Sequence, residues 1–227
     1  MGTNDGMKKV LVVGASRGTG RAAVEELLAA GHEVTAFSRR ASALVLESPR
    51  LSKVDGDATV YEDVDAAVRG HDAVIVTLGI AENPLGVRLF GGGKTPLDVR
   101  SVGTRHVVEA MERHGVARLV VQSTFGVGES EGLLGTMDRL FFALLLKPQI
   151  EDTVRQEAIV RGSALDWVLA QPVHLTDGDD GVEAKASTRG ETGRMKVARR
   201  QVARVLVRAT RAPEFVGRSV AISGGAA

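Results

Sequence analysis

The stretch Val10-Leu11-Val12-Val13-Gly14-Ala15-Ser16-Arg17-Gly18-Thr19-Gly20 decides how this chain is expected to fold. Four apolar residues run directly into three glycines, and a helical pattern follows over Arg21–Leu28. This order is typical of a strand, a tight turn and a helix. Gly14 lets the strand turn without a Cβ clash, Gly18 lets the backbone approach a ligand, and Gly20 lets the helix pack against the strand.

The helix that follows these glycines directs its free N–H groups and the positive end of its dipole at the loop, where a pyrophosphate is stabilised. A glycine cluster alone is weak support, because most such clusters are simple turns. Here Gly31-His32 leads on to a second strand-like segment, Glu33–Phe37, which completes the βαβ order that the motif requires. The sequence therefore predicts a dinucleotide site at this loop.

The end of the second predicted strand indicates which dinucleotide binds. Sites that prefer NAD carry an acidic residue about 20 positions past the glycines, which binds the ribose 2′-hydroxyl. This chain has Ser38-Arg39-Arg40 there. A guanidinium can bind a 2′-phosphate through two parallel hydrogen bonds, and Arg17 in the loop can reach the same phosphate from the other side. The alternative is a solvated turn, but two independent positions favour NADPH/NADP+ as the cofactor.

Composition limits the class of protein. With 227 residues, 44% of them apolar, we expect a single α/β domain over residues 1–227 with a modest C-terminal elaboration. A net charge of +1 gives no reason to expect nucleic acid or an anionic membrane as partner. The absence of cysteine excludes disulfides, thiolate nucleophiles and zinc–sulfur sites, and we expect no metal site. The polar N-terminus and the short apolar run Leu140–Leu146 favour a cytoplasmic protein.

Strand-like and helix-like segments alternate along the rest of the chain. Further strands are predicted at Leu51–Asp55, Asp72–Gly79, Arg118–Thr124, Asp166–Ala170 and Ser219–Ile222, and helices at Val60–Val68, Val99–His114, Ile150–Arg161 and Arg199–Thr210. Pro148 is expected to break the helix at Ile150 from the preceding one, and the tract Thr176–Gly193 to cover the substrate side as loops. The alternation predicts a doubly wound, Rossmann-type parallel sheet that Ser219–Ile222 closes.

Open α/β sheets bind ligands at the carboxyl ends of their strands. Asp57, just past the third predicted strand, can accept a hydrogen bond from the adenine amino group, or it can do the commoner job of capping the helix at Val60. The residues predicted to bind the cofactor belong to the glycine loop and to these strand ends: Gly14, Ser16, Arg17, Gly18, Thr19, Gly20, Arg39, Arg40, Asp57, Ala58, Thr77, Leu78, Gly79 and Pro172.

With these segments placed, the chain resembles an atypical short-chain dehydrogenase/reductase of the NAD(P)H-binding group that includes biliverdin reductase B/flavin reductase and the NmrA-like proteins. The resemblance covers nearly the whole chain and is carried by the glycine loop, Arg39, Gly56-Asp57 and residues 71–76, 103–111, 163–167 and 171–174. Two features depart from it. The glycine spacing is that of the larger short-chain group, whose Tyr-x-x-x-Lys pair is nevertheless absent, because the only tyrosine, Tyr61, is followed four residues later by Asp65.

Three polar side chains at strand ends are available for chemistry: Ser123, Thr124 and His174. The resemblance implies that Thr124 takes the place of a serine beside the nicotinamide and that His174 takes the place of a pocket histidine. A histidine titrates near neutrality and can donate a proton. The alternative is a structural histidine that only hydrogen-bonds to the backbone. The histidines at 32, 71, 106 and 114 are expected to be solvated.

Without a strong acid, acceptors that spread negative charge themselves need the least help from the protein. We therefore expect an NADPH-dependent reductase of a small conjugated acceptor such as a flavin, quinone, enone or linear tetrapyrrole, acting as a monomer or homodimer. The alternatives are a redox sensor of the NmrA kind that binds NADPH without using it, and an isomerase or epimerase with a tightly held cofactor. The segment Ile80–Pro96 is expected to be either a functional lid or disordered, and Leu133–Leu146 either a lid or an interface.

Overall fold

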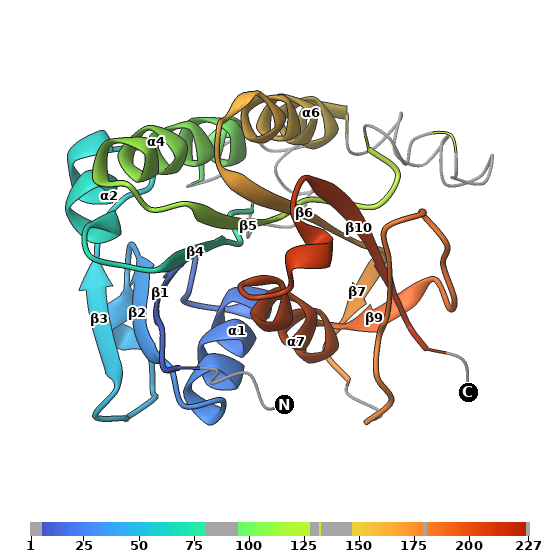
Figure 1. Ribbon diagram of the computed structural model, residues 1–227, viewed down its shortest axis with the longest axis horizontal. Coiled ribbons are helices and arrows are strands. Elements are labelled where there is room, and N and C mark those ends of the chain that lie inside the picture. Colours follow the sequence, from blue (N-terminus) through green and yellow to red (C-terminus); the bar gives the residue numbers. More distant parts are fainter. Residues whose placement is uncertain (1–5, 80–94, 128–131, 133–146, 179–180, 226–227) are drawn as a thin grey trace.

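Eight strands form the main sheet of the computed structural model, which describes residues 6–79, 95–127, 132, 147–178 and 181–225 (Figure 1). In spatial order they are β3 (Leu51–Asp55), β2 (Glu33–Ser38), β1 (Lys9–Val13), β4 (Ala73–Val76), β5 (Arg118–Gln122), β6 (Asp166–Pro172), β10 (Arg218–Ser223) and β8 (Lys185–Ser187). All neighbouring strands are parallel except β10 and β8. The predicted doubly wound fold is confirmed, with one antiparallel strand at its edge.

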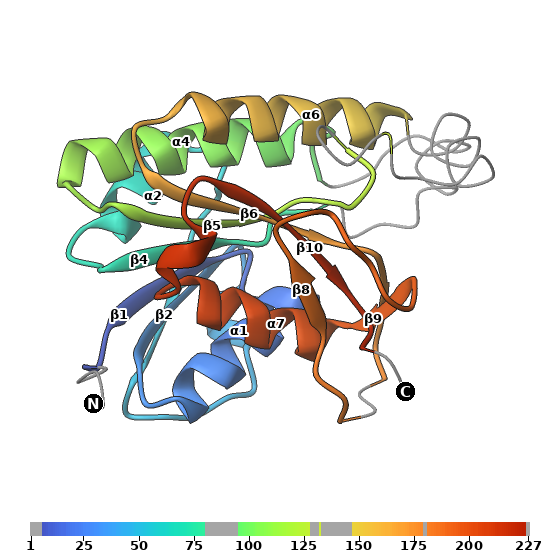
Figure 2. The same ribbon diagram turned by 45° about the vertical axis from the view of Figure 1, so that its right-hand side comes forward.

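Helices cover both faces of this sheet (Figures 1 and 2). Helices α1 (Gly18–Ala29) and α7 (Arg199–Ala209) pack together on one face, and α2 (Tyr61–Val68), α4 (Val99–His114) and α6 (Lys147–Gly162) lie on the other. Alternate residues of β1 therefore enter different cores: Val10 and Val12 lie under α1 and α7, whereas Leu11 and Val13 lie under the other three helices. Burial on both faces explains why this strand is apolar without interruption.

The structure corrects three expectations about the second half of the chain. The tract that was expected to form loops contains β8, and it lies between β7 (His174–Thr176) and β9 (Lys196–Ala198), which pair in a separate two-stranded sheet. Strands of three residues are too short to show an alternating pattern. Because β8 pairs with β10, the segment Ser219–Ile222 does not close the sheet. Pro148 lies in the first turn of α6, where a helix tolerates the missing N–H group, and does not precede the helix.

The turn between β1 and α1 depends on very close packing of backbone. Gly14 has a φ of +90°, and a Cβ atom on Gly20 would lie 2.2 Å from the Gly14 carbonyl oxygen. Thr77, just past β4, holds the same carbonyl region: its N–H and its hydroxyl donate to the Val13 oxygen at 2.9 and 3.1 Å. The expected roles of Gly14 and Gly20 in the turn and in helix packing are therefore confirmed.

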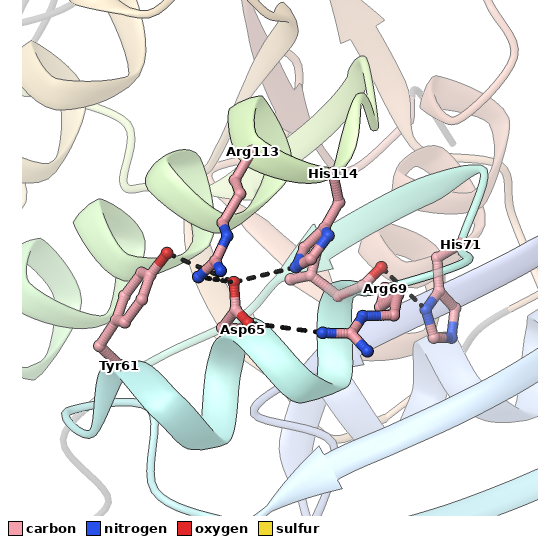
Figure 3. Close-up of polar contacts among 7 residues, drawn as sticks. Tyr61, Asp65, Arg69, His71, Arg113 and His114 are labelled. Atoms are coloured by element: carbon pink, nitrogen blue, oxygen red, sulfur yellow. Dashed lines mark hydrogen bonds and ion pairs between the residues drawn. The ribbon is translucent and has the colours of Figure 1, made fainter.

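The contact between α2 and α4 is centred on one carboxylate, Asp65 (Figure 3). Its Oδ1 atom lies 2.9 Å from His114 Nε2 and 3.3 Å from Arg113 Nη1, and it accepts a hydrogen bond from the Tyr61 hydroxyl at 3.3 Å. Arg69 Nη2 lies 4.0 Å from the other oxygen. Burial raises the pKa of Asp65, but the hydrogen bond from His114 and the charge of Arg113 outweigh it, so the pKa is held below its ordinary value.

The expectation that the remaining histidines are solvated is wrong. His32 is buried, and the rings at 71, 106 and 114 are half-buried. Each ring has a local polar partner that offsets its burial: the Lys8 N–H for His32, the Thr35 hydroxyl for His71, the Ala58 carbonyl for His106 and Asp65 for His114. Burial also lowers the pKa of His71, which favours its neutral ring. These four histidines serve the fold.

We predict that Gly20→Ala destabilises the protein, because the new methyl group would meet a backbone oxygen that cannot move aside cheaply. Overpacking of this kind costs about 1–3 kcal/mol, which urea denaturation measures as a lower midpoint. Gly162→Ala is the matched control: it adds the same methyl group at the end of α6, where nothing lies within 4 Å. Equal midpoints for Gly20→Ala and the wild type would contradict the packing described above.

Asp65 generates a second prediction, on pH. Because the folded protein lowers the pKa of Asp65, its carboxylate contributes stability that is present above its unfolded pKa of about 3.9 and is lost as the pH falls through the folded value. Asp65→Asn is expected to lower the urea midpoint at neutral pH and to flatten its decline at acidic pH. Glu112→Gln, which removes an exposed carboxylate from α4, should leave that decline steep. Parallel acid profiles for Asp65→Asn and the wild type would refute this assignment.

Candidate functional site

The amino end of α1 lies at the carboxyl end of β1 and is a candidate anion-binding site. Arg17 occupies the position before the helix, and within the described part of the chain no side chain caps the helix and no acidic residue lies in its first turn. Ser16 is half-buried, Arg17 and Gly18 are exposed, and Thr19 and Gly20 are buried. The N–H groups at this end therefore lack a carboxylate of their own, which favours binding of a phosphate.

Helix α4 shows the contrasting case. Its amino end is capped from α6 by Asp152, a buried residue whose carboxylate accepts hydrogen bonds from the Arg100 N–H at 3.0 Å and from the Ser101 N–H at 3.2 Å. The Ser101 hydroxyl donates to the same carboxylate at 2.5 Å. Because α4 receives its negative charge from Asp152, its amino end is already satisfied, whereas that of α1 is open to a ligand.

Three exposed arginines flank the α1 site where the sequence predicted them: Arg17 in the loop, and Arg39 and Arg40 just past β2. Arg39 Nη2 donates to the buried hydroxyl of Thr95 at 3.0 Å, which orients its guanidinium. A fourth arginine, Arg199 at the start of α7, was not anticipated. Its side chain comes within 3.6 Å of where a Cβ on Gly18 would lie.

The end of β3 carries the predicted residues Asp57 and Ala58. The carboxylate of Asp57 accepts hydrogen bonds from the N–H and hydroxyl of Thr59 at 2.9 and 2.8 Å, and so closes the turn that precedes α2. The position before α2 is Val60, and α2 has no side-chain cap, so the alternative that Asp57 caps this helix is wrong. Ala58 is buried beneath the turn.

Past β4, the predicted residues Thr77, Leu78 and Gly79 lie beside the glycine loop and α4. Thr77 holds the loop, as described above, and Leu78 fills the space over Gly103 in α4. At Gly79, a Cβ atom would lie 3.3 Å from Arg100 Nη2. Within the described residues, Arg100 Nε is buried without a hydrogen-bond partner. Burial lowers the pKa of Arg100 and the Asp152 charge opposes this shift, but a guanidinium stays charged in a protein.

The two hydroxyl residues after β5 point in different directions. Ser123 is buried, and its hydroxyl donates to Oε1 of Glu157, a buried carboxylate on α6. Thr124 is half-buried, and no residue in the described part of the chain hydrogen-bonds to its hydroxyl. Of the two, Thr124 is therefore the one whose hydroxyl is not engaged by any described residue.

Glu157 is the centre of a polar network that the sequence did not reveal. Its Oε1 atom also accepts a hydrogen bond from Gln171 Nε2 at 2.8 Å, and its Oε2 atom lies 2.8 Å from Arg161 Nη1. Arg161 Nη2 in turn donates to the Ser219 hydroxyl at 3.0 Å. This network ties α6 to the ends of β5 and β6 and to β10. The four-residue spacing of Glu157 and Arg161 on one predicted helix was the available signal.

His174 opens β7 and lines a cavity of about 760 Å³ beside the sheet. It is exposed, and its register partner across the two-stranded sheet is Lys196 of β9. The other lining residues are Thr176, Gly178, Arg194, Met195, Lys196, Ala198 and Gln201. Asp177, next to the lining residue Gly178, pairs with Arg199 at 2.5 Å, and Arg199 lies against Gly18. The cavity is therefore adjacent to the glycine loop.

Pro172, the last residue of β6, completes the predicted site residues. Its carbonyl accepts a hydrogen bond from the Phe125 N–H at 3.0 Å, so it lies beside the segment that carries Thr124. The structure thus brings most of the predicted residues to one edge of the sheet. The segments predicted as lid or interface, 80–94 and 133–146, lie outside the described residues.

In the described part of the chain, no group of three or more His, Asp or Glu side chains could hold a metal ion. None of the helices there is long and apolar enough to cross a membrane.

Known proteins with similar structures share this fold. A short-chain dehydrogenase/reductase of Veillonella parvula in complex with NADP aligns with a TM-score of 0.78 at 15% identity, over 95% of this chain and 94% of that one. An anaerobillin reductase of Escherichia coli O157:H7 aligns with a TM-score of 0.76 at 23% identity, over 96% of this chain and 98% of that one. At these identities, the likeness establishes the fold alone.

Proteins with similar sequences show higher identity than these structural matches. A 3-beta-hydroxysteroid dehydrogenase of Mycolicibacterium neoaurum is 36% identical over 126 residues, which is 52% of this chain and 32% of that protein. The chain thus matches about a third of the length of that relative. The sequence profile of the NAD(P)H-binding family matches residues 14–213, from the first glycine of the loop to the end of the chain's last predicted helix and just beyond. Because this match covers most of the chain, the protein belongs to the NAD(P)H-binding family.

Proposed function

We propose that the protein is an NADPH-dependent oxidoreductase that reduces a small conjugated organic acceptor by hydride transfer. The observation that carries this proposal is the uncapped amino end of α1, with arginines on both sides of it and an open cavity next to it. The NADP complex of a protein with this fold and the dehydrogenase and reductase names of similar proteins support it.

The residues present fit the cofactor from one end to the other. The loop has no Cβ at Gly14, Gly18 or Gly20, so a pyrophosphate can reach the α1 amides. On the β2 side, the Arg39 and Arg40 guanidiniums would hold the 2′-phosphate, with Arg17 facing them and with Asp57 and Ala58 at the adenine. On the β5 side, Thr124 and Pro172 would border the nicotinamide. NADPH, when bound, supplies the hydride.

Thr124 and His174 would then have separate roles in the reaction. The Thr124 hydroxyl would orient the nicotinamide or the acceptor, and His174 would donate a proton to an acceptor that develops negative charge. We assign Ser123 a positioning role, because its hydroxyl is held by Glu157 in the interior. A conjugated acceptor suits this site, since it delocalises the charge that a strong acid would otherwise neutralise.

One observation favours a second candidate, a sensor that binds NADPH without oxidising it. Within the described residues, no hydrogen-bond partner orients the His174 ring, whereas catalytic acids and bases are commonly oriented by a third group. Incubating the purified protein with NADPH and a panel of flavins, quinones and enones separates the two. Catalytic loss of NADPH absorbance supports the reductase, and tight binding with no turnover on any acceptor would support the sensor. Cofactor that stays unchanged through turnover would indicate an isomerase or epimerase.

The arginines beside β2 generate a prediction on cofactor choice. Arg39→Gln should weaken NADPH binding about ten-fold or more and leave NADH binding unchanged, because a hydrogen bond to a charged group contributes about 1.5–3 kcal/mol. Fluorescence titration with each cofactor measures the two affinities. Arg50→Gln removes an exposed arginine at the opposite end of β3 and serves as the control. An equal loss for both cofactors would mean that Arg39 does not recognise the 2′-phosphate.

A second prediction concerns the reacting end. His174→Gln should lower kcat by about 10²-fold for enones, which need a proton, and less for flavins, with NADPH affinity retained. Thr124→Val should lower kcat for every acceptor. Ser123→Ala is the matched comparison for Thr124→Val: it should lower the urea midpoint, because it leaves buried Glu157 short of a partner. Wild-type kcat in both His174→Gln and Thr124→Val would remove these residues from the reaction.

A further inference from the structure

One buried cation at the proposed site is unexplained by the cofactor. Arg100 is the second residue of α4, and Nη2 and Cζ of its guanidinium lie 3.3 and 3.7 Å from where a Cβ on Gly79 would be. The side chain is largely covered, and Nε is buried without a hydrogen-bond partner among the described residues. A buried charged donor without a partner is unfavourable, so its place next to Gly79 calls for a ligand.

Among the described residues, no carboxylate pairs directly with this guanidinium. Asp152, the carboxylate whose charge acts on Arg100, uses its oxygens on the Arg100 and Ser101 N–H groups and on the Ser101 hydroxyl. No hydrogen bond or ion pair joins the Arg100 side chain to Asp152 or to any other described residue. The charge is therefore attracted by Asp152 across space, while the donors of the guanidinium remain available.

The sheet register places this cation beside the reacting end of the site. Val76 of β4 and Val121 of β5 are register partners. Gly79 and Thr124 each lie three residues beyond that pair, so the two segments leave the sheet side by side. Arg100, beside Gly79, thus lies past the end of β4, the strand next to β5, and β5 is followed by Thr124, which the proposed function puts at the nicotinamide. The pyrophosphate site at α1 lies on the other face of the sheet from α4 (Figures 1 and 2).

We propose that Arg100 is a specificity-determining residue that binds an acidic group of the acceptor, a carboxylate, phosphate or sulfonate. This inference rests on the proposed function, which supplies the position of the nicotinamide. A guanidinium presents several N–H donors in a plane that matches such oxyanions, and the surrounding burial strengthens the contact. The protein accordingly prefers the anionic member of a pair of acceptors that differ by one acidic group.

The test compares matched pairs: FMN with riboflavin, and 1,2-naphthoquinone-4-sulfonate with 1,2-naphthoquinone. Binding of each compound to the NADP+-loaded protein is measured by fluorescence quenching, which requires no turnover. The wild type should bind the charged member of at least one pair about ten-fold or more tightly, and Arg100→Met should lose most of that preference. Arg100→Lys, which keeps the charge without the planar fork, should retain part of it. Arg105→Met removes an exposed arginine from the same helix and should keep the preference intact.

Other outcomes overturn the inference. These are equal affinities within both pairs, failure of all four compounds to bind, or an unchanged preference in Arg100→Met. A large loss of NADPH affinity in Arg100→Met, with the acceptor preference intact, would assign the residue to the cofactor instead. If the binding preference depends on Arg100 but no acceptor is reduced, the reductase proposal fails while the anion site stands. If acceptors are reduced without such a preference, the anion site fails alone.

Discussion

The whole arrangement depends on how closely α1 approaches the end of β1. A Cβ on Gly20 would lie 2.2 Å from the Gly14 carbonyl oxygen, and Thr77 occupies the remaining space around that oxygen. Only hydrogen fits between helix and turn, so the direction of α1 is determined by backbone contact. The first amides of α1 consequently point past the carboxyl edge of β1, where a phosphate can meet several of them at once. The residues at the ends of β2, β4 and β5 supply further side chains around this contact between α1 and β1.

Negative charge is distributed unevenly between the helix ends at that edge of the sheet. Asp152 of α6 satisfies the amino end of α4, whereas α1 receives no carboxylate from the described part of the chain. Two helix ends with similar dipoles therefore differ in function: one is used to join α4 to α6, and the other is open to a ligand. Around the open end the exposed side chains are arginines. An edge built this way attracts a polyanion before any specific contact forms.

Sequence patterns predicted the central elements well, because their physics is local. The strand residues Val10–Val13 and the helix Val99–His114, ended by Gly115, have the periods and the terminal glycine that such elements require. The sequence could not reveal contacts made across long separations. Glu157 on α6 meets Ser123 just past β5, and Arg100 on α4 reaches Gly79 just past β4. Arg199 at the start of α7 reaches Gly18, which lies about 180 residues earlier in the sequence. Histidines that look solvated in a turn, such as His32, become buried when a residue distant in sequence supplies their partner, here the Lys8 N–H just before β1.

The network around Glu157 explains how the ends of β5 and β6 are held in place at this edge. Glu157 holds the Ser123 hydroxyl and the Gln171 amide from below, so the ends of β5 and β6 are fixed relative to each other. A buried carboxylate is tolerated there because both of its oxygens have partners, including the Arg161 guanidinium. Thr124 and Pro172 follow directly on these fixed strand ends. In the proposed reductase, rate enhancement would come largely from holding donor and acceptor in place, and the Glu157 network supports the two strand ends for that task.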